Sequence, residues 1–167
     1  MAKGKSLVII SHWSTMIEGL PASPQEFFQS VETAVQNKSV PDTKFSRVDW
    51  KEGGIISAKR EYLRIKRKDL AFDICGAPFG NGFFVSWWLG EAPSYLAQLA
   101  MDIPIIGPLF TRLAKPLTYY QLDTAAMFQA LIHSAVLEVI DEITKAKGLR
   151  ALSDDARKPI MRDFFDI

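Results

Sequence analysis

Positions 75 to 84, CGAPFGNGFF, hold the only cysteine of the chain and three glycines that could cradle a ligand. A glycine loop that binds phosphate leads from a strand into a helix, whose first amides face the anion. Here the residues on both sides of the loop have strand-like patterns, so the glycines predict a hairpin connection. Cys75 is expected to be buried and inert, because free cysteines are among the most buried residues.

The other residues that could carry chemistry do not form a recognisable catalytic or metal site. His12 and His133 are far apart in the sequence and lack the spacing of zinc ligands. The acidic residues between positions 138 and 142 are followed by Lys145, four residues after Asp141, which is typical of a solvated helix stripe with an ion pair. The sequence therefore predicts no metal, no cofactor and no identifiable catalytic residue, which favours a protein that is not an enzyme.

The alternation of side chains along the predicted strands groups a set of polar residues on one face of the sheet. In KREYLRIKRK, positions 59 to 68, alternate residues from Arg60 to Lys66 point to one side of a strand. If the next two strands follow in hairpins, Asp73 lies centrally beside Tyr62 and Ser86, with arginines at diagonal positions. The predicted binding residues on this face are Arg60, Tyr62, Arg64, Lys66, Asp73, Phe84, Ser86 and Trp88.

Two interpretations of the basic stripe stay open. With its interleaved tyrosine it could bind phosphate, RNA or an anionic lipid surface. It could equally be an ordinary charged strand that protects the sheet from edge aggregation. The aromatic side chains Phe84 and Trp88 indicate that something covers this face, whether another segment of the chain, a partner subunit, a lipid headgroup layer or a ligand.

These residues have to be positioned by an α+β fold, which we expect to be a single domain over residues 1–167. Ser23, Pro24 and Glu26 combine a capping box with proline at the first helical position, and predict a helix over 24–37. Residues 45–89 alternate with period two and predict a four-stranded antiparallel meander. A long helix capped by Asp123 or Thr124, and ending near 145–147, should pack on one face of that sheet.

The hairpin turns predict a strand register. A turn at Arg67-Lys68 sets Ile65 opposite Leu70, and the next hairpin sets Ile74 opposite Val85. One face is then apolar throughout and should lie under the long helix: Leu63, Ile65, Leu70, Phe72, Ile74, Val85, Trp87 and Leu89.

Two further segments are harder to place. A turn at Gly53-Gly54 would set Arg47 opposite Arg60, and like charges in that position repel, so a bulge or a shifted register is expected near Lys59. The segment 92–110 contains three prolines and a glycine, so it should form a short helix and an irregular connection rather than a membrane span. After position 159 we expect a short terminal helix.

Composition limits the function classes. The chain of 167 residues is 48% hydrophobic and has 20 basic and 19 acidic residues, so its net charge of +1 gives no overall attraction to nucleic acid. A single cysteine is typical of a reducing compartment and predicts a cytoplasmic protein, which can also lie at a membrane surface.

Two hypotheses about function follow. The first is a non-catalytic subunit or adaptor that binds a protein partner, another copy of itself or an anionic membrane through the aromatic and basic face. The second is a small-molecule-binding protein or enzyme that uses the same face around Asp73.

Overall fold

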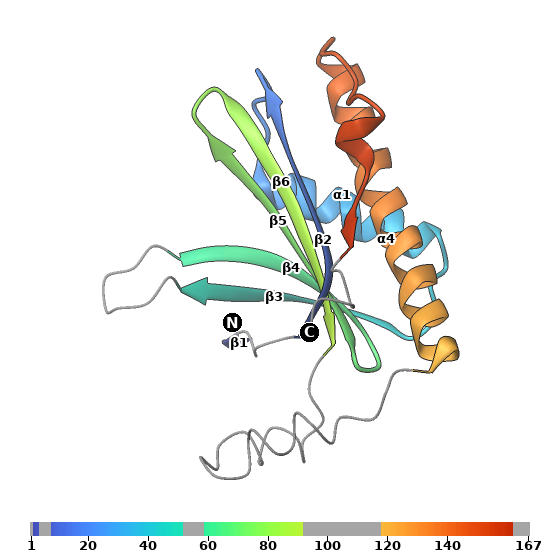
Figure 1. Cartoon of the computed structure of the whole chain (residues 1–167). Coiled ribbons are helices and arrows are strands. Elements are labelled where there is room, and N and C mark those ends of the chain that lie inside the picture. Colours follow the sequence, from blue (N-terminus) through green and yellow to red (C-terminus); the bar gives the residue numbers. More distant parts are fainter. Residues whose placement is uncertain (1, 4–7, 52–58, 92–117, 162–167) are drawn as a thin grey trace.

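The structure is a computed structural model that describes residues 2–3, 8–51, 59–91 and 118–161 (Figure 1). Its elements are β1 (Ala2–Lys3), β2 (Val8–Glu18), α1 (Pro24–Asn37), β3 (Thr43–Lys51), β4 (Lys59–Arg67), β5 (Leu70–Phe79), β6 (Gly82–Glu91), α4 (Tyr119–Ala146), the 3-10 turn η1 (Asp155–Arg157) and β7 (Ile160–Met161). The α+β class is confirmed, with one largely antiparallel sheet and a long C-terminal helix.

The sheet differs from the predicted four-stranded meander. Its strand order is β1-β3-β4-β5-β6-β2-β7, so five long strands pair side by side and two strands of two residues lie at the edges. The missed long strand is β2, which pairs with β6 along its whole length, from Val8 opposite Glu91 to Glu18 opposite Gly82. Only its first residues form an apolar run, and a bulge between Ile9 and Ser11 breaks its alternation, so its length was hidden in the sequence.

The predicted register was wrong by two residues in both later hairpins. Ile65 lies opposite Phe72 rather than Leu70, and Ile74 lies opposite Trp87 rather than Val85. The turns were misplaced: the first is formed by Lys68, at φ +52°, and the residue after it. Because side chains alternate with period two, an error of two residues leaves every side chain on the predicted face.

The first hairpin has a shifted register, as predicted. Arg47 lies opposite Leu63, and Arg60 lies opposite Trp50, so the two arginines are not paired. The pairing continues without a break from Thr43 and Arg67 to the last pair of the two strands. The turn predicted at 53–54 and the connection predicted over 92–110 lie outside the described residues.

The two helices begin at caps that the sequence encodes, although one was misread. Ser23 accepts a hydrogen bond from the Glu26 amide at the start of α1, as predicted. Helix α4 begins before the predicted caps: Thr118 and Gln121 form a reciprocal capping box, and the helix continues for 28 residues.

Both helices pack on the same side of the sheet, which we call the inner face; the opposite side is the outer face (Figure 1). The inner face contains the predicted apolar residues, and Phe72, Trp87 and Leu89 are fully buried there. On α4 the apolar side chains of Met127 and Leu131 are exposed. Helix α4 is long and apolar enough to cross a membrane, but the buried core helices of soluble proteins meet the same criteria of length and composition.

The end of the described chain also differs from the prediction. Instead of starting a helix after position 159, the chain forms β7, which pairs with β2 through Ser11 and His12. Pro159 fixes an extended approach, and the free edge of β2 offers backbone partners. The terminal segment is thereby attached to the sheet.

Gly76 allows α1 to approach the sheet closely. A Cβ atom at this position would lie 2.6 Å from Cδ1 of Phe27 and 3.0 Å from Cζ of Phe83. We expect Gly76→Ala to lower the free energy of unfolding by about 1–3 kcal/mol, through overpacking. Phe27→Leu in the same chain should recover part of that loss, as measured by urea unfolding of both single variants and the double variant. Additive effects would contradict this contact.

Candidate functional site

All eight predicted binding residues fall on the outer face, but they are not all grouped as expected. They lie in several cross-strand rows of β4, β5 and β6, and Arg60 and Tyr62 lie on β4 beyond Leu63, where the pairing of β4 with β5 ends. Asp73 lies between Arg64 and Trp88, whereas Tyr62 and Ser86 belong to the neighbouring row with Cys75. This is the consequence of the two-residue register error: the face is right, and the neighbours are shifted.

Arg64 and Asp73 form a closed ion pair. The guanidinium Nε and Nη2 atoms donate to Oδ1 and Oδ2 of the carboxylate, each at 2.6 Å. Both side chains are buried, and the guanidinium lies 5.9 Å from the centroid of the Trp50 ring. The Asp73 carboxylate thus already has a partner on both oxygens, which makes it a poor candidate for a ligand contact or a general base.

Cys75 is an inert residue of this face. It is fully buried and lies opposite Ser86. Burial raises the pKa of the thiol, while the charge of Arg60 and a hydrogen bond from Ser86 oppose that shift only in part. A thiol with a raised pKa is protonated at neutral pH and is a weak nucleophile, in agreement with the prediction from the sequence.

The margins of the outer face are open. Arg60 and Lys66 are exposed, and Phe84 is partly exposed. The ring of Trp88 is 39% exposed and stacks on His12, with centroids 4.7 Å apart and planes 14° from parallel. These groups are available for contact, whereas the centre of the face is not.

His133 connects the inner face to the C-terminal segment. Trp87 Nε1 donates to His133 Nδ1 at 3.0 Å, so the ring proton must lie on Nε2, which donates to the Arg157 carbonyl at 2.7 Å. Burial lowers the pKa of His133, and the charge of Arg157 acts in the same direction against the hydrogen bond to its carbonyl. The histidine is a satisfied structural group, and no sequence signal linked it to Trp87.

The acidic stripe of α4 is ion-paired with other parts of the chain. Both carboxylate oxygens of Asp141 accept from Arg157, at 2.6 and 3.0 Å, instead of pairing with Lys145 as predicted. Glu138 accepts from Lys38 at 2.8 Å. In the described part of the chain, no three histidine, cysteine, aspartate or glutamate side chains are grouped so that they could hold a metal ion.

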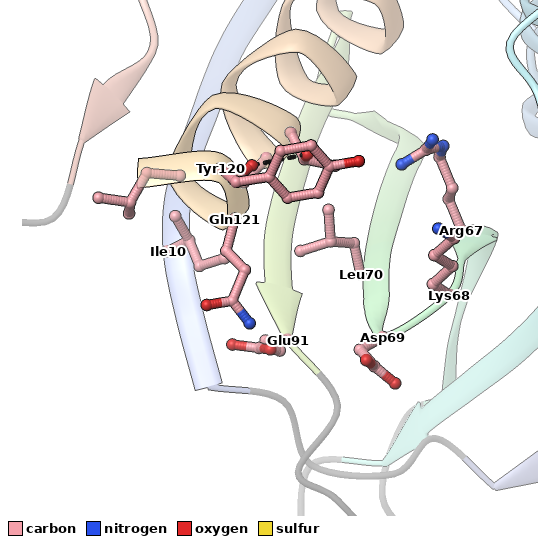
Figure 2. A pocket seen from close by; sticks show the side chains of 11 residues that line it. Ile10, Arg67, Lys68, Asp69, Leu70, Glu91, Tyr120 and Gln121 are labelled. Carbon is pink, nitrogen blue, oxygen red and sulfur yellow. Dashed lines mark hydrogen bonds between the residues drawn. The ribbon is translucent and has the colours of Figure 1, made fainter. Parts of the chain in front are cut away.

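A pocket of about 220 Å³ opens between the first turns of α4 and the sheet (Figure 2). Ile10, at the bulge of β2, and Leu70, at the start of β5, form apolar walls below the helix. Tyr120 and Gln121 extend from the helix over the pocket. Among the described residues, the lining consists of Ile10, Arg67, Lys68, Asp69, Leu70, Glu91, Tyr120, Gln121, Leu122, Thr124 and Ala125.

Two carboxylates lie at one end of this pocket. The pKa of Glu91 is raised, first by burial and second by the negative charge of Asp69. Neither carboxylate takes part in an ion pair within the described residues, and the Gln121 side chain points toward Glu91 (Figure 2). The Arg67 Nε donates instead to the Pro41 carbonyl at 3.2 Å. The polar end of the pocket therefore offers hydrogen-bond acceptors.

Sequence reasoning missed this pocket because four separate segments form it. The helix start supplies Tyr120 and Gln121, which lie before the predicted caps at Asp123 or Thr124. The Thr118 and Gln121 capping box was the signal that could have found them.

Replacing Asp73 tests whether the outer-face ion pair is structural. Asp73→Asn leaves a buried guanidinium without a counter-charge, and we expect the free energy of unfolding to fall by about 3–5 kcal/mol. Arg64→Met combined with Asp73→Leu removes both charges and should restore most of the loss. Urea unfolding measures both effects, and an Asp73→Asn variant as stable as the wild type would contradict the structural role.

The lowered pKa of the buried His133 predicts a dependence of stability on pH. Because the pKa is lowered in the folded chain, the unfolded chain binds a proton first as the pH falls through its ordinary value of 6.5. The free energy of unfolding should therefore decrease below about pH 6.5, and by less in a His133→Leu variant, which cannot titrate there. Chemical unfolding at pH 7.5 and 5.5 compares the two proteins; equal decreases would exclude His133 as the source.

No protein-family model, no curated protein and no solved structure matches this chain. A function has therefore to be inferred from the side chains, the surfaces and the pocket of the chain itself.

Proposed function

We propose that this protein binds a small, mostly apolar molecule in the pocket between α4 and the sheet. The observation that supports this is the pocket itself: an apolar recess of about 220 Å³ with two carboxylates at one end and the cations Arg67 and Lys68 also in its lining. Ligand sites are typically concave and apolar, with a few polar groups that orient the bound molecule. The small-molecule hypothesis drawn from the sequence is kept, but its site moves from the outer face to the inner one.

The volume limits the size of the ligand. A dry cavity of about 150 Å³ admits a benzene molecule, and sites for drug-sized ligands start near 300 Å³. A pocket of about 220 Å³ falls between these values, so it fits a one-ring or two-ring molecule or a short aliphatic chain.

The polar end limits the chemistry of the ligand. Glu91 is partly buried, and its burial and the negative charge of Asp69 raise its pKa. As carboxylates, both groups can accept hydrogen bonds from a ligand. A hydroxyl, amide or amine donor on the ligand would satisfy them, and a protonated amine would also relieve the repulsion between the two carboxylates. A ligand that carries a carboxylate at this end would add to that repulsion.

Filling the pocket tests the proposal. Ala125 is buried and lines the pocket, whereas its neighbour Ala126 is exposed, so Ala125→Leu and Ala126→Leu add the same atoms at two different places. We expect indole and benzylamine to shift the amide NMR signals of pocket residues in the wild type. Ala125→Leu should weaken binding at least tenfold, and Ala126→Leu should leave it unchanged.

Benzoate serves as the charge control, since it matches benzylamine in size but carries the opposite charge. We expect it to bind more weakly than benzylamine, and the difference should shrink in Glu91→Gln. Equal binding of indole by both leucine variants, or tighter binding of benzoate than of benzylamine, would be evidence against the proposal.

A further inference from the structure

The exposed apolar side chains of the described residues fall mainly into two groups. One group follows α4. The other lies on the outer face, where Met16 is 41% exposed, Phe79 is 70% exposed and Ile160 is 57% exposed, together with Trp88. Neither α1 nor α4, the α-helices of the described residues, lies on this face (Figure 1). An exposed apolar set of this kind on one face is typical of an interaction surface.

The outer face also carries three exposed cations, Lys44, Lys66 and Arg60. Lys44 and Lys66 are exposed and lie directly opposite each other on β3 and β4, where like charges repel. No ion pair within the described residues includes either lysine or Arg60, whereas Arg64 is neutralised by Asp73. An anionic partner would relieve the repulsion that the folded chain leaves at this position.

The hairpin between β5 and β6 ends in an uncharged tip. Residues 77–82, APFGNG, contain no charged side chain, and Phe79 projects from them with most of its surface exposed. Gly80 adopts a φ of +59° at the turn, which favours glycine, and no atom lies within 4 Å of where its Cβ would be. The tip is thus uncharged, with Phe79 as its exposed apolar side chain and Asn81 as its exposed polar one; the exposed Glu18 lies on the neighbouring strand, opposite Gly82.

From these features we propose that the outer face docks on an anionic lipid bilayer. Phe79 and Met16 would enter the edge of the hydrocarbon region, Trp88 would lie at headgroup level, and Lys44, Lys66 and Arg60 would contact lipid phosphates. A bilayer accepts single protruding apolar side chains, whereas a protein partner needs a closely packed apolar centre. Here the centre of the face is the buried Arg64 and Asp73 pair, and the exposed groups lie around it. This surface is separate from the pocket, and the two proposals stand independently.

The experiment uses the whole chain and vesicles of stated composition. Sedimentation is measured with vesicles of phosphatidylcholine alone and with vesicles that contain 30% phosphatidylserine. We expect binding to the anionic vesicles only, weakened by salt. Each lysine near an anionic surface contributes about a fivefold change in partition, so Lys44→Gln with Lys66→Gln should lower binding about 25-fold.

Two controls are needed. One tests whether binding depends on this surface rather than on the overall charge, and the other tests whether the partner is a membrane rather than an acidic protein. Lys145→Gln with Lys147→Gln removes the same charge from exposed residues at the end of α4, and should change binding less than twofold. Phe79→Ser should weaken binding to vesicles but not to soluble polyglutamate. The proposal would be overturned if the protein did not bind anionic vesicles, or if the two double variants lost binding equally. It would also be overturned if polyglutamate bound as tightly as vesicles and Phe79→Ser left both affinities unchanged; that outcome would assign the face to an acidic protein.

Discussion

The hydrogen bond between Trp87 and His133 connects the sheet, helix α4 and the C-terminal segment that leads to β7. Trp87 is fully buried at the centre of the inner face, packs against Phe72 and donates a hydrogen bond to His133 of α4. His133 in turn donates to the Arg157 carbonyl, which fixes the segment leading to β7. A buried polar group must find a partner, so this chain of bonds sets where α4 lies on the sheet. With the helix fixed there, its first turns extend over Ile10 and Leu70 and create the pocket, and neither α1 nor α4 lies over the outer face.

Much of the sheet could be predicted from the sequence because alternation survives small errors. The register was misplaced by two residues in both hairpins, yet every predicted residue stayed on its face, and the outer face contains all eight predicted binding residues. The position of the turn decides which residues of the two strands lie opposite each other, and one residue at positive φ in the turn changes that position. Asp73 was therefore expected beside Tyr62 and Ser86 and instead lies opposite Arg64, which changes its role from a candidate ligand contact to half of a buried ion pair.

The remaining errors concern features that no local pattern encodes. Strand β2 lies next to β6 although the two are far apart in the sequence, and its bulge at Ile9 interrupts the alternation that would have revealed it. The pocket is formed by the ends of four segments, so its existence follows from the packing of α4 and not from any motif. The start of α4 is the exception, since the capping box of Thr118 and Gln121 is local and could have been found.

Intermolecular NOEs between bound indole and the methyl groups around the pocket test the central claim most directly, that the space between α4 and the sheet is a binding site. We expect NOEs to the methyl groups of Ile10, Leu70 and Leu122, which line the pocket from three different elements. NOEs confined to Met16 on the outer face, or to Met127 and Leu131 on the exposed side of α4, would contradict it, because they would show that the molecule binds apolar surface outside the pocket.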